Sequence, residues 1–212
     1  MSHPSEAQMK LNLHIKYLKQ QLFFEPASAP LHYNLALAYA QKGQLEEAIS
    51  EFKQAIECDP QLVEAYVNMG GIHYQKGDLD ACIAANEKAI AIKPHMATAH
   101  SNLGSAHLQK GDFQRAIEAS QTAIDLDPNQ LQAHNNLAVA YIQADNPRAS
   151  VEASRKALEI NGNFTPAHYN LAVAYRMMGD IPSAREHYQQ AKAMGFPFDA
   201  ATESEWKSLD QN

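Results

Sequence analysis

Hydrophobic residues near the start of the chain follow the spacing of one helical face. Four of them lie at offsets of four, three and four residues, namely Leu11, Ile15, Leu18 and Leu22, which is typical of an amphipathic helix. Ser5 and Gln8 have the spacing of a capping box. We therefore expect a helix over residues 5–25, ended by Pro26 because proline cannot continue a helix.

From residue 29 onward, the pattern of apolar, small and polar residues recurs every 34 residues. Five units follow one another without insertion or deletion and are called repeats 1 to 5, at residues 29–62, 63–96, 97–130, 131–164 and 165–198. Positions are counted from the first residue of each repeat. A fixed period in the thirties is typical of stacked helical repeats, so the sequence predicts an all-α solenoid.

Each repeat has the pattern of a helix, a tight turn and a second helix. Position 7 holds leucine or methionine, and position 8 holds alanine or glycine, which lets two helix backbones approach closely. Glycine fills the turn in repeats 1, 2, 3 and 5, because a positive φ favours it there. Residues suited to capping the second helix follow the turn, namely Asp78, Asp112, Asn146 and Asp180. Repeat 4 has Asp145 in place of the glycine, and we expect Asp145 to adopt the left-handed conformation.

The two ends of the chain depart from the repeat. The helix within residues 5–26 stands where the second helix of a preceding repeat would lie, so we interpret it as a half-repeat that caps the stack. Residues 199–212 are predicted to hold a C-terminal capping helix. Its start is placed at Thr202, because Thr202 and Glu205 have capping-box spacing, and Trp206 and Leu209 would share one face.

Composition narrows the possible functions. The net charge is −7, and the chain lacks the cluster of basic residues that is typical of nucleic-acid binding. It also contains no run of about 18 apolar residues, the length that a membrane-spanning helix needs. Cys58 and Cys82 show no metal or redox spacing and occupy packing positions, so we expect both to be reduced and buried. No apolar core of a secretion signal is visible. The prediction is a cytoplasmic protein without a cofactor.

These repeats resemble the tetratricopeptide repeat. Repeat 1 carries the family pattern at His32, Leu35, Ala36, Tyr39, Ala48, Phe52, Ala55 and Pro60. The resemblance covers residues 29–198 and implies antiparallel helix pairs in a right-handed superhelix, with the first helices lining an inner groove. Within the family, the segments around His100 and His134 and the run Gly179–Ala184 are most similar to the repeats that precede the catalytic domain of O-linked N-acetylglucosamine transferase. No glycosyltransferase domain accompanies them here, so only a binding mode is implied.

The resemblance also implies which positions face the groove. Position 6 supplies a row of asparagines, Asn34, Asn68, Asn102, Asn136 and Asn170, and position 13 a row of glutamines, Gln41, Gln75, Gln109 and Gln143. Between the rows and near their ends lie Tyr33, Leu37, Tyr74, Leu108, Val139, Ile142, Tyr169 and Val173. A carboxamide both donates and accepts hydrogen bonds, so it can bracket a peptide unit. The prediction is a scaffold or adaptor that binds an extended protein segment, as similar asparagine ladders do in the transferase repeats.

Other interpretations of these residues stay open. Asparagine at position 6 can instead tie one repeat to the next. The charged clamp that some family members use for a terminal carboxylate is not predicted, because Arg176 is the single basic residue at the groove positions.

The alternative function is that of a self-associating structural protein. It would be a possible homo-oligomer joined through aromatic residues near its ends: Phe23, Phe24, Phe196, Phe198 and Trp206.

Metal binding and catalysis are the least favoured functions. The histidines at position 4, His32, His100, His134 and His168, and those at position 11, His73 and His107, occupy the slots of bulky packing residues. Sites in successive repeats are also too far apart to share one ion at bonds of about 2 Å. No nucleophile, acid and base combination is left once each residue's repeat position is explained. We therefore predict no catalytic residue and no metal ligand.

Overall fold

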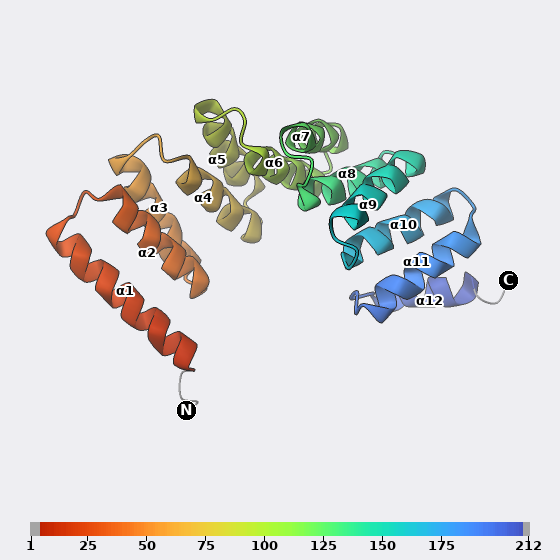
Figure 1. The fold of residues 1–212 in the computed structure, drawn as a ribbon, viewed down its shortest axis with the longest axis horizontal. Coiled ribbons are helices and arrows are strands. Elements are labelled where there is room, and N and C mark those ends of the chain that lie inside the picture. The colour runs from red at the N-terminus through yellow and green to blue at the C-terminus, as the bar shows by residue number, and fades with distance from the viewer. Residues whose placement is uncertain (1–4, 210–212) are drawn as a thin grey trace. The chain divides into compact units, whose positions relative to one another are not determined.

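The computed structural model describes residues 5–209, which form helices joined by short turns (Figure 1). The first six helices are α1 (Glu6–Phe24), α2 (Ala29–Gln41), α3 (Leu45–Cys58), α4 (Val63–Gln75), α5 (Leu79–Ile92) and α6 (Ala97–Lys110). The others are α7 (Phe113–Leu126), α8 (Leu131–Gln143), α9 (Pro147–Ile160), α10 (Thr165–Met177), α11 (Ile181–Ala193) and α12 (Ala200–Leu209). The chain divides into two compact units, one up to Asn102 and the other from Leu103 onward.

The first unit stacks helix pairs on the N-terminal helix. Helices α2 and α3 form one antiparallel pair, α4 and α5 form another, and α1 packs against α2 (Figure 1). Leu18, Leu35 and Phe52 are almost completely buried in the core between α1, α2 and α3. The predicted capping box of α1 is confirmed, because Ser5 and Gln8 each accept a hydrogen bond from the other's backbone N–H.

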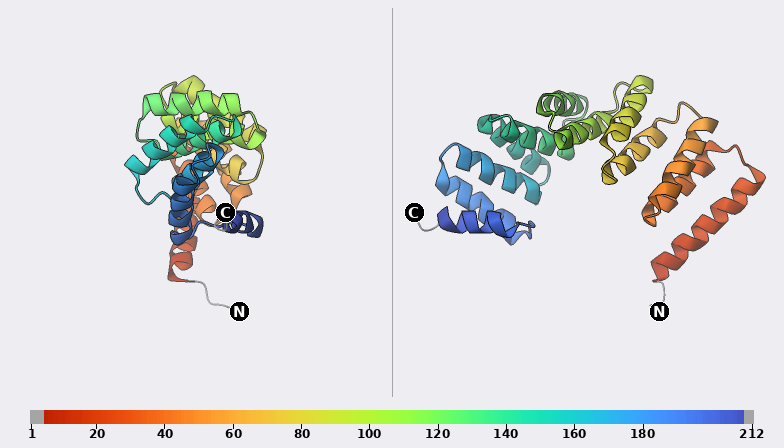
Figure 2. Two further views of the ribbon diagram at one scale, coloured as in Figure 1. Left: turned by 90° about the vertical axis from the view of Figure 1, so that its right-hand side faces the viewer. Right: turned by 180° about the vertical axis from the view of Figure 1, so that it is seen from behind.

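The second unit repeats the arrangement. Helices α8 and α9 form a pair, as do α10 and α11, and α7 packs against α8; Figure 2 shows this pairing from two other sides. Leu137 and Leu171 are buried under these pairs, and Trp206 of α12 is buried against Tyr188 of α11. Among the helices that the structure describes, none is both long and apolar enough to cross a membrane.

The turns between paired helices have the predicted backbone geometry. The turn glycines of repeats 1, 2, 3 and 5 have φ between 77° and 79°, the left-handed region that glycine adopts without cost. Asp145 takes the same role in repeat 4 with φ 55°, as predicted. The four predicted caps, Asp78, Asp112, Asn146 and Asp180, each accept a hydrogen bond from a backbone N–H three residues on.

Two sequence-based expectations are wrong. Helix α12 begins at Ala200 rather than Thr202, because the Asp199 carboxylate accepts a hydrogen bond from the Thr202 backbone N–H at 2.7 Å and so caps the helix earlier. Cys58 is exposed, whereas Cys82 is buried, because Cys58 is the last residue of α3. Of the residues assigned to this capping segment, 210–212 and the side chain of Leu209 lie outside the described part.

Buried polar residues replace an aromatic residue in the middle repeats. Position 24 holds Phe52 in repeat 1 and Tyr188 in repeat 5, but Asn86, Ser120 and Ser154 in between, and all five are buried. Asn86 donates to the Cys82 carbonyl oxygen at 2.8 Å. A β-carbon added at Gly70 would lie 2.5 Å from Asn86 Nδ2. Gly70 is therefore needed because Asn86 fills the space between α4 and α5.

Candidate functional site

The candidate site is the exposed side of the first helices of the repeats. Positions 7 and 8 face inward, as the buried Leu35 and Ala36 show, while position 13 faces out. All four glutamines of that row are exposed, namely Gln41, Gln75, Gln109 and Gln143. The part of the chain that the structure describes offers them no hydrogen-bonding partner, so these carboxamides point into solvent with donor and acceptor available.

The asparagines of the ladder differ in exposure along the chain. Asn34 is exposed, Asn68 and Asn102 are half-buried, and Asn136 and Asn170 retain only 2% and 4% of their accessible surface. Asn34 has no complete repeat before it, whereas side chains of the preceding repeat contact the others, as the bonds of Asn68 to Tyr33 and of Asn136 to Ser105 show. Within the ladder, Asn34 is therefore the member most available to a ligand.

In the first unit, two ladder asparagines hydrogen bond to the preceding repeat. Asn68 Nδ2 donates to the Tyr33 hydroxyl at 2.9 Å. Asn102 Nδ2 donates to Asn86 Oδ1 at 3.1 Å, and Asn86 is itself completely buried. Each bond uses one N–H of the carboxamide and holds the group in one orientation, while no residue in the described part of the chain donates to its oxygen.

In the second unit the same kind of bond recurs. Asn136 Nδ2 donates to Ser105 Oγ at 2.8 Å, and its oxygen accepts from Gln132 at 2.8 Å. Asn170 Nδ2 donates to Asn135 Oδ1 at 3.0 Å. A hydrogen bond from position 6 to the preceding repeat therefore recurs in repeats 2 to 5. A ligand contact at these asparagines would be made in addition to this bond.

The predicted apolar residues fall into two groups. Leu37 and Tyr74 are 38% and 39% exposed, and Tyr33 lines a hollow of about 150 Å³ together with Asn34 and Leu62. Four others are half-buried: Leu108, Val139, Ile142 and Val173. The surface of the first helices thus carries exposed apolar contacts beside its carboxamides, most of all in the first unit.

Tyr169 of α10 packs against aromatic residues of the segment that follows α11. Its ring stacks on Phe196 with centroids 4.7 Å apart and meets Phe198 edge-on at 5.6 Å. Arg176 lies over the Trp206 ring at 5.4 Å, a distance at which a cation is attracted to the ring face. These two residues of α10 therefore contact the segment after α11.

Three of the four histidines at position 4 make the same hydrogen bond to the loop before their repeat. The Nε2 atoms of His32, His100 and His134 lie 3.0, 3.0 and 2.9 Å from the carbonyl oxygens of the prolines six residues earlier. A carbonyl only accepts, so Nε2 carries the hydrogen in each ring. This bond fastens the loop that enters the repeat. Among the described residues, no cluster of three or more metal-ligating side chains forms.

Burial shifts the pKa of two side chains, His187 and Cys82. Desolvation lowers the pKa of His187 below 6.5, with Gln190 acting in the opposite direction. Burial raises the pKa of the Cys82 thiol, which leaves it protonated and unreactive. Neither group lies among the predicted binding residues, and both effects follow from packing of the second helices.

Comparison with known proteins identifies the repeat. Models described as TPR repeat or tetratricopeptide repeat match residues 36–77, 61–129, 95–162 and 165–194. The search of curated proteins gave no match.

Solved structures share the fold. The MamA protein is 25% identical with a TM-score of 0.69 and aligns over 78% of this chain and 91% of its own. PilF of Pseudomonas aeruginosa is 21% identical with a TM-score of 0.73, over 87% of both chains. YrrB, described as a TPR protein with an unusual peptide-binding site, is 18% identical with a TM-score of 0.68, over 84% of this chain and 92% of its own. With repeat models over 36–162 and 165–194, the chain belongs to the tetratricopeptide repeat family.

Proposed function

We propose that this chain is a non-enzymatic scaffold that holds an extended peptide segment of a partner protein along the first helices within a unit. The observation that carries the proposal is the exposed glutamine at position 13 of repeats 1 to 4, accompanied by exposed apolar side chains such as Leu37 and Tyr74. A carboxamide can donate to a peptide carbonyl and accept from a peptide N–H. Such a surface can bind the backbone of a peptide without recognising its charged terminus.

The asparagine ladder has a second part in the proposal. Asn34 is exposed, while Asn68, Asn102 and Asn170 each use one N–H in a tie to the preceding repeat. The tie fixes the carboxamide before a ligand arrives, so less side-chain entropy is lost on binding. Membership of a repeat family that serves protein interaction supports this role. The resemblance to the repeats of O-linked N-acetylglucosamine transferase supports the backbone-directed mode.

Display of random peptides on the full chain tests the proposal. Peptides selected against the wild type are expected to bind about tenfold more weakly when both Tyr74→Ala and Gln75→Ala are present, a loss of about 1.4 kcal/mol. Gln54→Ala is the matched control, because Gln54 is an exposed glutamine on the second helix α3. Selected peptides that bind the Tyr74 and Gln75 variant as tightly as the wild type would exclude this surface.

A pair of variants separates ligand contact from the structural tie at Asn68. Asn68→Ala and Tyr33→Phe each remove the hydrogen bond between these side chains, and each is expected to lower stability by about 1 kcal/mol. Only Asn68→Ala removes the carboxamide. If Asn68 contacts the peptide, affinity falls in Asn68→Ala and is retained in Tyr33→Phe, whereas retention in both assigns Asn68 to structure alone.

Self-association is the second candidate, and one face of α1 favours it. Met9, Leu13, Tyr17, Phe23 and Phe24 are large hydrophobic residues between 48% and 82% exposed. They lie opposite the stripe that packs on α2. Light scattering over a concentration series tests this candidate, and Leu13→Glu with Tyr17→Glu should restore a monomer. A wild-type mass that stays monomeric at every concentration would reject it.

A further inference from the structure

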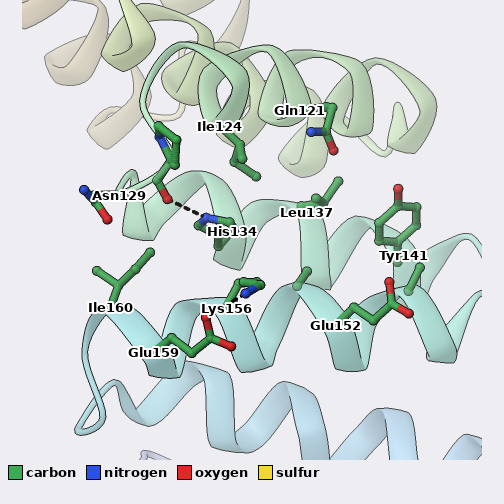
Figure 3. A pocket seen from close by; sticks show the side chains of 13 residues that line it. Gln121, Ile124, Asn129, His134, Leu137, Tyr141, Glu152, Lys156, Glu159 and Ile160 are labelled. Atoms are coloured by element: carbon green, nitrogen blue, oxygen red, sulfur yellow. Dashed lines mark hydrogen bonds and ion pairs between the residues drawn. The ribbon is translucent and has the colours of Figure 1, made fainter.

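A cavity of about 710 Å³ opens in the second unit between α7, α8 and α9 (Figure 3). Its apolar lining includes Ile124 of α7, Leu137 and Tyr141 of α8, and Ala153 and Ile160 of α9. The volume lies within the range of ligand sites, about 300–1,000 Å³. The first-helix surface proposed above shares no residue with this lining.

A small residue at position 23 of repeat 4 borders the cavity. That position holds Ala153 here and alanine in repeats 2 and 3 as well, but Glu51 in repeat 1 and His187 in repeat 5. The His187 ring stacks on Tyr175, with centroids 5.7 Å apart and planes 5° apart, and its centroid lies 5.4 Å from that of His168. Tyr141 and His134 occupy the corresponding positions in repeat 4. The next repeat therefore shows that a planar ring fits between these two side chains.

His134 presents an unused acceptor at this place. It is only 6% exposed and lines the cavity. Its Nε2 is 2.9 Å from the Pro128 carbonyl oxygen, so Nε2 carries the hydrogen, and in the neutral ring Nδ1 bears a lone pair. In repeats 1 and 5 the same Nδ1 atom meets Glu51 Oε2 at 2.6 Å and His187 Nδ1 at 3.2 Å. In repeat 4 no described residue bonds to it.

Charged residues surround the cavity mouth. Lys156 and Glu159 form an ion pair at 2.7 Å, whereas Glu152 has no such partner among the described residues. The rim therefore carries one uncompensated negative charge beside an apolar floor. A protein segment with an aromatic anchor and a neighbouring basic residue matches both features, since aromatic anchors in desolvated pockets are typical of protein interfaces.

We propose that this cavity binds a tyrosine or tryptophan side chain of a partner protein in the space that His187 fills in the next repeat. The ring stacks on Tyr141, and its O–H or N–H donates to His134 Nδ1. The contact is a second interaction site of the scaffold, on residues that the peptide surface of the first helices does not use. It stands or falls independently of that surface.

Side-chain surrogates test the pocket itself. Nuclear magnetic resonance titrations with 4-methylphenol and indole are expected to shift the signals of Tyr141, Ala153 and His134. Ala153→His, which supplies the chain's own ring, is expected to abolish these shifts. Ala119→His is the matched control, because Ala119 holds position 23 of repeat 3 and is not part of the lining. Surrogates that bind Ala153→His as well as wild type overturn the proposal.

Two further variants test the ring contacts separately. His134→Phe keeps a ring of similar size, so we expect it to weaken 4-methylphenol about fivefold, equivalent to one neutral hydrogen bond, and to leave toluene unchanged. Tyr141→Leu removes the stacking face without filling the cavity and should weaken all three probes. Equal losses of toluene and 4-methylphenol in His134→Phe would overturn the donor assignment.

Peptide display identifies the source of the ring. Peptides are selected on the wild-type chain and counter-selected on Ala153→His. The expected survivors share a tyrosine or tryptophan next to a lysine or arginine, and their affinity falls about tenfold when Glu152→Gln and His134→Phe are combined. If the surrogates bind but no aromatic peptide survives counter-selection, the cavity takes free small molecules and the protein-partner proposal is overturned.

Discussion

Single side chains decide how closely the two helices of a repeat approach. In repeat 2, Asn86 fills the space in front of Gly70 and leaves no room for a β-carbon. In repeat 4 the corresponding positions hold Ala138 and Ser154, both buried. Serine and alanine thus share this space in repeat 4, although in repeat 3 a β-carbon added at Gly104 would lie 2.5 Å from Ser120 Oγ. Because alanine at position 8 accompanies Phe52 and Tyr188 in repeats 1 and 5, the coupling through volume belongs to the pair Gly70 and Asn86, which lie 16 residues apart.

This coupling predicts a destabilised variant and its rescue. Gly70→Ala is expected to lower the free energy of unfolding by about 1–3 kcal/mol, because its β-carbon displaces the buried Asn86 side chain. Adding Asn86→Ser recreates the pair of repeat 4 and should recover part of the loss, since it also removes the acceptor of the Asn102 hydrogen bond. Gly71→Ala is the control: nothing lies within 4 Å of an added β-carbon, so helix propensity alone should raise stability by about 1 kcal/mol. Urea unfolding measures all three, and a double variant no more stable than Gly70→Ala would contradict the coupling.

The left-handed turn of repeat 4 gives a second prediction. Asp145 has φ 55°, where the other turns hold glycine. Asp145→Gly is expected to stabilise the chain by about 1 kcal/mol, because a side chain in this conformation is strained. The reverse change Gly111→Asp, at φ 77°, should cost a similar amount in thermal unfolding. No gain in Asp145→Gly would mean that the Asp145 side chain offsets its own strain.

At the scale of helices, features set by neighbouring residues could be predicted and features set by distant ones could not. The caps Asp78, Asp112, Asn146 and Asp180 bond within their own helix, so spacing alone reveals them. Asp199 and Thr202 both have cap chemistry in one short segment, and spacing did not show which would act. The bond between Asn68 and Tyr33 and the space left by Ala153 depend on how successive repeats pack. The positions of the carboxamides could therefore be read from the sequence, but the burial of Asn136 and Asn170 could not.

The pair α10 and α11 carries a pH-sensitive contact. Desolvation lowers the pKa of His187 in the folded chain, helped by His168 and Arg155 and opposed by Gln190 and Glu186. The unfolded chain then binds more protons once the pH falls below about 6.5, so the stability that the neutral ring contributes is present above that pH and is lost below it. His187→Phe keeps a ring against Tyr175 and does not titrate. We expect the midpoint of urea unfolding to fall less steeply between about pH 7 and pH 5 in this variant; identical slopes would contradict the assignment.

At the scale of the whole molecule, a repeat array differs from a globule because each repeat contacts only its neighbours. The chain accordingly resolves into two compact units rather than one core. The hydrophobic side chains of the terminal repeats still have to be shielded from water by a capping helix. Trp206 of α12 supplies it in the second unit, stacking on Tyr188 with centroids 4.7 Å apart and planes 10° apart. The effect of removing it should therefore stay close to the removed ring.

Trp206→Ala tests this locality. Loss of the buried indole is expected to cost about 3–5 kcal/mol in the stability of the helices that it covers. Backbone amide exchange should accelerate in α10 and α11 and remain unchanged in α2 and α3, since energy in such arrays is carried between nearest neighbours. Phe23→Ala is the control, because Phe23 is 82% exposed and its removal should change exchange little in either unit. Equal acceleration in α2 and α11 would show that the two units unfold as one cooperative body, and nearest-neighbour energetics would then fail for this chain.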